Sequence, residues 1–139
     1  DRRDGMLYFR PPHDTAHKAP GPGAYVSQAQ NVIRLLSGTE HVTFRGLRIE
    51  HARGTAVAAA PADGDRRGAA AVSHISLINC TVANSGGNGI EILGWQCLVS
   101  GCEVYGVGGT AINVTGGLHM TLTPGRNQVD GSWVHDFGQ

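Results

Sequence analysis

The feature that most constrains this chain is a pattern that occurs four times: a strand, a glycine-rich corner and, in the longer copies, a second strand. The copies are residues 46–57, 79–94, 101–112 and 131–138. Equivalent positions in successive copies are 33, 22 and 30 residues apart, as in Leu47, Cys80, Cys102 and Ser132. A repeat of about twenty residues is typical of one coil of a parallel β-helix, and longer shifts indicate the same coil with an added loop.

Alternation within each copy indicates which side chains face inward. Alternate residues of a strand share a face, so aligned apolar positions stack coil on coil into a core that no single repeat could bury. The inward columns are Leu47, Cys80, Cys102 and Ser132; Ile49, Val82, Val104 and Val134; Val57, Ile90 and Ile112; and Ala59, Ile92 and Val114. The outward columns include Arg48, Thr81, Glu103 and Trp133, and Glu50, Ala83, Tyr105 and His135. Glycine pairs at the corners suit backbone that a Cβ would hinder. We therefore predict an all-β parallel β-helix of about four coils.

The chain divides into two parts. Residues 1–30 are expected to form a short strand, Met6 to Arg10, followed by a loop rich in proline and glycine. Residues 31–139 are expected to form the coils, with loops inserted at 61–71 and 117–127. Arg66 and Arg67 could contact an anionic ligand, but a solvated loop is favoured. Because no capping segment precedes Gln139, we expect the solenoid to be truncated or covered by another chain, which leaves self-association open.

Composition excludes several functions. The formal net charge is +0 and the pI about 7.2, so there is no electrostatic case for binding nucleic acid or an anionic membrane. No apolar run reaches the roughly 18 residues that a membrane span needs. The three cysteines are not spaced as zinc ligands, and buried thiols are favoured over a Cys80–Cys102 disulfide. The histidines His41, His51, His74 and His135 are not expected to share a column, so neither a metal nor a cofactor is predicted.

The outward columns contain one group of residues suited to carbohydrate chemistry. Glu103 and Asp136 are predicted to lie on adjacent coils, and glycoside hydrolysis uses two carboxylates about 5–5.5 Å or 6.5–9.5 Å apart. Trp133, Tyr105 and His135 flank them, and aromatic rings bind the apolar face of a sugar. We assign Glu103 and Asp136 as catalytic candidates, and Trp133, Tyr105, His135 and Glu91 as substrate-binding candidates. The alternative is that these residues are ordinary decoration of a solvent-facing sheet.

Four segments resemble a known group of proteins. They are DRRDGMLYFRPP, NVIRLLSGTEHVTFRGLRIEHARGTAV, SHISLINCTVANSGGNGIEILG and LTPGRNQVDGSWVHDFGQ. Together they resemble secreted bacterial proteins with right-handed parallel β-helix repeats, of the pectate-lyase-like superfamily. The group with an assigned activity that they resemble is glycoside hydrolase family 141, whose members act on plant cell-wall glycans as α-L-fucosidases or xylanases. The chain departs from that pattern at Gln139, where the family usually has Arg, and at Gly131-Ser132, where it usually has an Asn pair.

The resemblance implies a secreted or periplasmic protein whose partner is a polysaccharide or oligosaccharide. It also implies further coils that carry acidic catalytic residues, so the 139 residues alone are expected to lack turnover. Three functions stay open: part of a glycoside hydrolase, a non-catalytic glycan-binding or structural solenoid, and a polysaccharide lyase. The lyase ranks lower because no cluster of Asp for Ca²⁺ recurs at coil spacing.

Overall fold

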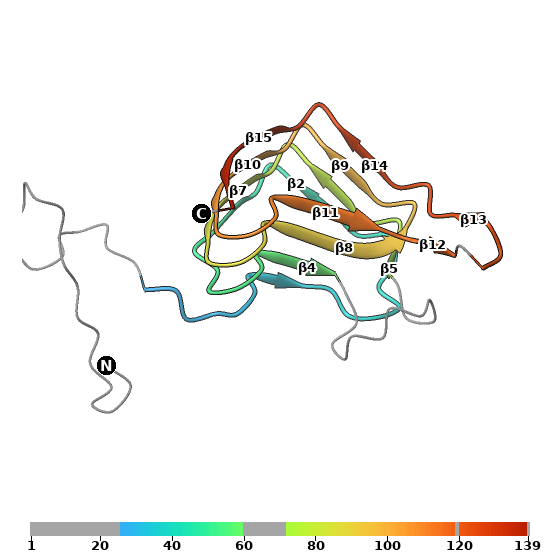
Figure 1. Ribbon diagram of the computed structural model, residues 1–139, viewed down its shortest axis with the longest axis horizontal. Coiled ribbons are helices and arrows are strands. Elements are labelled where there is room, and N and C mark those ends of the chain that lie inside the picture. Colours follow the sequence, from blue (N-terminus) through green and yellow to red (C-terminus); the bar gives the residue numbers. More distant parts are fainter. Residues whose placement is uncertain (1–25, 60–71, 119, 139) are drawn as a thin grey trace, which may run out of the picture.

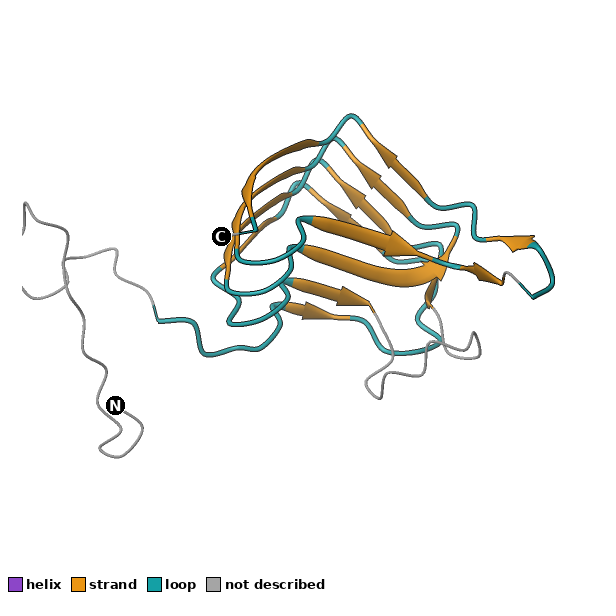
Figure 2. Cartoon of the chain, viewed as in Figure 1, coloured by secondary structure: helices purple, strands orange, loops and turns teal. Residues whose placement is uncertain are grey.

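The computed structural model describes residues 26–59, 72–118 and 120–138 and contains strands and no helix within those ranges. The expected strand at Met6 to Arg10 and the loop containing Arg66 and Arg67 lie outside the described residues. The assignment of residues 1–30 and 31–139 to two parts stays a prediction. The strands wind into coils that stack on one another, which confirms the predicted parallel β-helix (Figures 1 and 2).

Each complete coil contributes one strand to each of three parallel sheets. The first sheet holds β2 (Thr43–Arg45), β6 (Ser76–Ile78), β9 (Leu98–Ser100) and β14 (Gln128–Asp130). The second holds β3 (Arg48–Glu50), β7 (Thr81–Ser85), β10 (Glu103–Val107) and β15 (Trp133–Phe137). The third holds β1 (Ile33–Arg34), β4 (Val57–Ala59), β8 (Ile90–Trp95) and β11 (Ile112–Thr115), and β5 (Val72–Ser73) pairs with the end of β8. An antiparallel hairpin, β12 (Gly117–Leu118) and β13 (Thr123–Pro124), projects from the last full coil.

The strand register matches the repeat shifts in the sequence. Arg48 pairs with Thr81, Thr81 with Glu103, and Glu103 with Trp133. The shift of 30 residues contains the β12–β13 hairpin, and the shift of 33 contains residues 60–71, outside the described part. Insertions between a strand of the third sheet and the next coil therefore lengthen the chain without changing how the coils stack.

Two strands per repeat were predicted from the sequence, whereas each complete coil of the structure has three. The additional strands are β2, β6, β9 and β14, which are three residues long and place Phe44, Leu77, Val99 and Val129 in one column. A three-residue strand offers one inward residue, so alternation cannot identify it. These strands close the third side of the core.

The core is the stack of inward columns, and it is tightest in the middle coils. Cys80, Cys102, Val82, Val104, Ile90 and Ile92 are essentially inaccessible, and the three cysteines are free thiols. Leu47 was predicted to be inward but is 44% exposed, and Val134 is only half-buried. The first and last coils have a described neighbour on one side only, so their side chains are covered less.

Three further columns share a left-handed backbone, which lets the chain turn at the same place in every coil. The columns are Gly46, Asn79, Gly101 and Gly131; His51, Asn84, Gly106 and Asp136; and His41, His74, Gln96 and Arg126, all with φ between 49° and 64°. Gly, Asn, Asp and His tolerate this region better than most residues. The four histidines do not fall in one column, but two of them, His41 and His74, share a column and their rings stack with centroids 4.3 Å apart.

Candidate functional site

Five of the six predicted site residues come together on the outward face of the second sheet. Glu103 and Tyr105 project from β10, and Trp133, His135 and Asp136 from β15. Glu103 pairs in register with Trp133, and Tyr105 pairs with His135. With Arg48 and Glu50 of β3 they form what we call the aromatic–acidic strip: Arg48, Glu50, Glu103, Tyr105, Trp133, His135 and Asp136. The strip runs across the strands, along the solenoid axis.

The imidazole of His135 is the centre of the strip. It stacks on the Tyr105 ring with centroids 5.0 Å apart and planes 7° from parallel. It also contacts the Trp133 indole, whose centroid lies 4.4 Å away at an interplanar angle of 36°. Trp133 nevertheless remains 65% exposed. The three rings therefore present one aromatic surface, and its outermost member offers a free face to a ligand.

His135 also joins the two acidic candidates. Its Nδ1 lies 2.9 Å from Asp136 Oδ2, and its Nε2 lies 3.6 Å from Glu103 Oε1. Nε2 has no solvent contact and no hydrogen-bond partner within the usual distance limit. The hydrogen bond that His135 donates to the Asp136 carboxylate raises the pKa of His135 above its usual 6.5, burial opposes this rise, and the contact with Glu103 adds to it. The arrangement favours an imidazolium held between two carboxylates.

Arg48 and Glu50 belong to the strip but were not among the predicted site residues. Arg48 Nη2 donates a hydrogen bond to the Tyr105 hydroxyl, 3.1 Å away, and its guanidinium forms an ion pair with Glu50. That contact lowers the pKa of Glu50 and raises the pKa of Arg48. Arg48 lies in the outward column of Glu103, and Glu50 lies in the outward column of Tyr105. The alignment of the repeats could therefore have identified both residues.

Glu91, the sixth predicted site residue, lies outside the strip, and its role in substrate binding stays a prediction. Glu91 is on β8 in the third sheet, in register with Ala58 and Asn113. Its Oε2 accepts a hydrogen bond from Asn88 Nδ2 at 3.2 Å. Alternation shows that Glu91 faces outward, but it does not show which of the three sheets carries it.

Residues 26–59, 72–118 and 120–138 contain no group of three His, Cys, Asp or Glu side chains placed to hold a metal ion. None of the described segments is a helix long and apolar enough to cross a membrane.

The fold and the strip define the chain as a parallel β-helix whose second sheet carries a solvent-exposed aromatic and acidic surface. Residues 31–135 match the family model described as right-handed β-helix region, and the chain belongs to that family. No curated protein and no solved structure matches the chain significantly.

Proposed function

We propose that the chain is part of a secreted or periplasmic carbohydrate-active β-helix protein, and that the aromatic–acidic strip binds a glycan. The observation that carries the proposal is the exposed Trp133 indole, which contacts His135, the residue that lies between the two carboxylates of Asp136 and Glu103. An indole face packs on the C–H face of a sugar ring, and adjacent carboxylates accept hydrogen bonds from its hydroxyls. The strip crosses four strands about 4.8 Å apart, a span that suits several sugar units in a row.

The reaction we propose for the parent protein is glycoside hydrolysis by two carboxylates. One carboxylic acid protonates the leaving oxygen, while the other attacks the anomeric carbon or activates a water. Glu103 and Asp136 are the candidates in this chain, on neighbouring strands and in contact with one imidazole. The resemblance to glycoside hydrolase family 141 supports this reaction class and plant cell-wall glycans as substrates. It also suggests that further acidic residues lie in other coils.

A non-catalytic glycan-binding surface is the second candidate, and one observation favours it. Both carboxylates already engage His135, so neither is free in the arrangement that general acid–base catalysis needs. On this hypothesis the strip binds a glycan chain without cleaving it. The two candidates share the ligand and differ in turnover.

The test combines binding and turnover on the purified chain. Xylan, pectic and fucosylated oligosaccharides are incubated with the wild type, with W133A and with the charge-removing pair E103Q and D136N. Light scattering on the same samples reports the oligomeric state. We expect W133A to weaken glycan binding about 5- to 30-fold, since it removes a stacking platform worth on the order of 1–2 kcal/mol.

Control variants keep the result interpretable. T43A alters an exposed position on β2 in the first sheet, outside the strip, and should bind as the wild type does. Sugar release that E103Q or D136N abolishes would support hydrolysis at the strip. Binding without release in this chain would favour the non-catalytic surface here and place the chemistry in other coils. Equal affinity of W133A and the wild type would overturn the proposal.

A further inference from the structure

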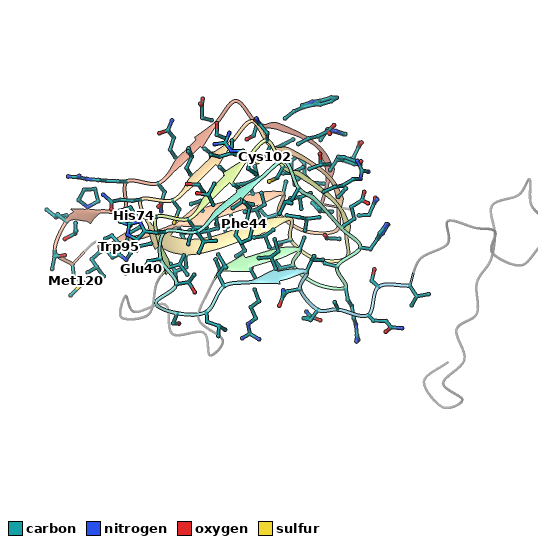
Figure 3. All side chains as sticks on the ribbon, turned by 180° about the vertical axis from the view of Figure 1, so that it is seen from behind. Glu40, Phe44, His74, Trp95, Cys102 and Met120 are labelled. Carbon is teal, nitrogen blue, oxygen red and sulfur yellow. The ribbon has the colours of Figure 1, made fainter. Side chains whose placement is uncertain are left out.

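A second feature with an aromatic wall lies away from the strip, where the β12–β13 hairpin meets the end of β8. A cleft of about 230 Å³ is lined by Trp95, Gln96, Thr123, Pro124, Gly125 and Arg126. Figure 1 shows the hairpin projecting on the side of the solenoid opposite the end of β15. Trp95 is half-buried, in line with Ser73 and, one strand further, Glu40. Figure 3 shows Glu40, His74 and Trp95 gathered at one edge of the molecule.

The walls of this cleft are held together by Asn127. Its Oδ1 accepts from the Cys97 amide at 3.0 Å, and its Nδ2 donates to the carbonyl oxygens of Gly94 at 2.9 Å and Thr115 at 3.2 Å. The backbone N–H of Gln96 also donates a hydrogen bond to the backbone carbonyl oxygen of Gly125, 2.7 Å away. The hairpin is therefore attached to the coil on both sides of the cleft. Such attachment reduces the ordering cost that a ligand would otherwise meet.

The lining chemistry selects a narrow class of ligand. Trp95 and Pro124 supply the apolar surface, and Gln96, Thr123 and Arg126 supply hydrogen-bonding groups around it. None of the lining residues is acidic, and Arg126 only donates, so the matching ligand group is a hydroxyl or a carboxylate oxygen. The volume lies below the roughly 300–1,000 Å³ of pockets for drug-sized ligands, which fits a single ring. The cleft is open to solvent, so that ring can be one unit of a longer chain.

We propose that the cleft between Trp95 and the β12–β13 hairpin binds one pyranose ring of a glycan, separately from the aromatic–acidic strip. The ring's C–H face packs on the Trp95 indole, and its oxygens accept hydrogen bonds from Arg126 and Gln96. A neutral sugar and an acidic sugar share this chemistry. A purely aromatic ligand would use the indole but leave the polar rim unpaired, so it is the disfavoured occupant.

The chain contains two tryptophans, which permits a direct test. In W133F, Trp95 is the sole tryptophan, and its fluorescence is followed while methyl β-D-xylopyranoside, methyl β-D-glucopyranoside, methyl α-L-fucopyranoside, glucuronate or adenosine is added. We expect a saturable change with at least one sugar and a Kd on the order of millimolar, as suits one ring in an open cleft. W133F/R126A should weaken that binding at least fivefold. W133F/R45A, which removes an exposed arginine from β2, is the matched control and should leave it unchanged.

The outcomes separate this cleft from the strip. No saturable change with any sugar, in protein whose circular dichroism is unaltered, would overturn the proposal, as would a response to adenosine alone or an equal loss in W133F/R126A and W133F/R45A. The reciprocal variant W95F retains Trp133 as the reporter of the strip. Sugar binding by W133F but not by W95F would support the cleft and refute the proposed function of the strip, and the reverse result would refute the cleft alone.

Discussion

Arg48 on β3 and Tyr105 on β10 are hydrogen-bonded, Nη2 to hydroxyl at 3.1 Å, although β7 lies between their strands. Two strand spacings separate their backbones by about 9–10 Å. The residue of β7 between Glu50 and Tyr105 is Ala83, whose small side chain faces outward and yet is fully buried. The small side chain of Ala83 leaves room for Arg48 and Tyr105 to meet above β7. Their hydrogen bond joins β3 to the aromatic group on β10 and β15.

The contact with Arg48 is the principal reason that the pKa of Glu50 is lowered. In R48M, which keeps the aliphatic stem but removes the guanidinium, we expect the Glu50 pKa to rise toward its ordinary value. Carbon-detected NMR titration of the carboxylate measures the change. R45M is the matched control and should leave Glu50 unaltered. The free energy of unfolding should change little, because Arg48 is exposed and water screens its ion pair with the half-buried Glu50. An unchanged Glu50 pKa in R48M would show that the contact is absent in solution.

His135 gives the strip a pH dependence with a defined sign. Its pKa is raised in the folded chain, chiefly by Asp136 and secondarily by Glu103. Its contribution to folding is therefore fully present below about pH 6.5 and is lost as the pH rises through the higher folded value. NMR titration of the imidazole should give a pKa above 6.5 in the wild type, a clearly lower value in D136N and a smaller decrease in E103Q.

D130N provides the control for that titration, since Asp130 is exposed on β14, outside the strip. It should leave the His135 pKa where the wild type has it. If D130N and D136N lowered the pKa equally, the shift would reflect general charge and not the contact at 2.9 Å. A wild-type value below 6.5 would mean that burial dominates over both carboxylates.

The sequence allowed prediction of the coils, their register and most of the strip, because these follow from local alternation and from spacing. Cys80, Val82 and Val104 were assigned inward correctly, and Glu103, Tyr105, Trp133, His135 and Asp136 do lie together. Alternation reports a face within one strand and nothing about which sheet holds that strand. Glu91, also a substrate-binding candidate, lies on the third sheet, away from the strip.

Other features depend on contacts that no local pattern contains. The exposure of Leu47 depends on how many coils cover it, and the partnership of Arg48 with Tyr105 depends on the size of Ala83 between them. The repeat shift of 33 residues places His41 in line with His74, but it does not show that their rings stack. The register of the strands can thus be predicted from the spacing of the repeats, whereas the contacts on a surface depend on which side chains the stacked coils bring together.

The inward column at Ile92 tests the stacked core. Ile92 is completely buried on β8, in register with Ala59 and Val114 on the neighbouring strands. I92A should lower the free energy of unfolding by about 2–5 kcal/mol, since the cavity cannot collapse in a regular stack. Urea denaturation measures the loss. T115A, at an exposed residue of β11, should stay within about 0.5 kcal/mol of the wild type. A loss below about 1 kcal/mol in I92A would mean that the coils repack around the cavity.

Asn127 makes the sharpest structural prediction, because one side chain joins three segments. In N127A the Cys97 amide loses its acceptor, and the carbonyl oxygens of Gly94 and Thr115 lose a donor. The expected cost is about 1–3 kcal/mol in the free energy of unfolding, with accelerated hydrogen exchange at the Cys97 amide. N127D keeps the acceptor and loses the donor, so it should retain protection at Cys97 while its carboxylate lies against two carbonyl oxygens and destabilises the hairpin. Q128A, at the exposed neighbouring position, should behave as the wild type. If the Cys97 amide exchanged equally slowly in N127A and in the wild type, Asn127 would not be what attaches the β12–β13 hairpin to the solenoid.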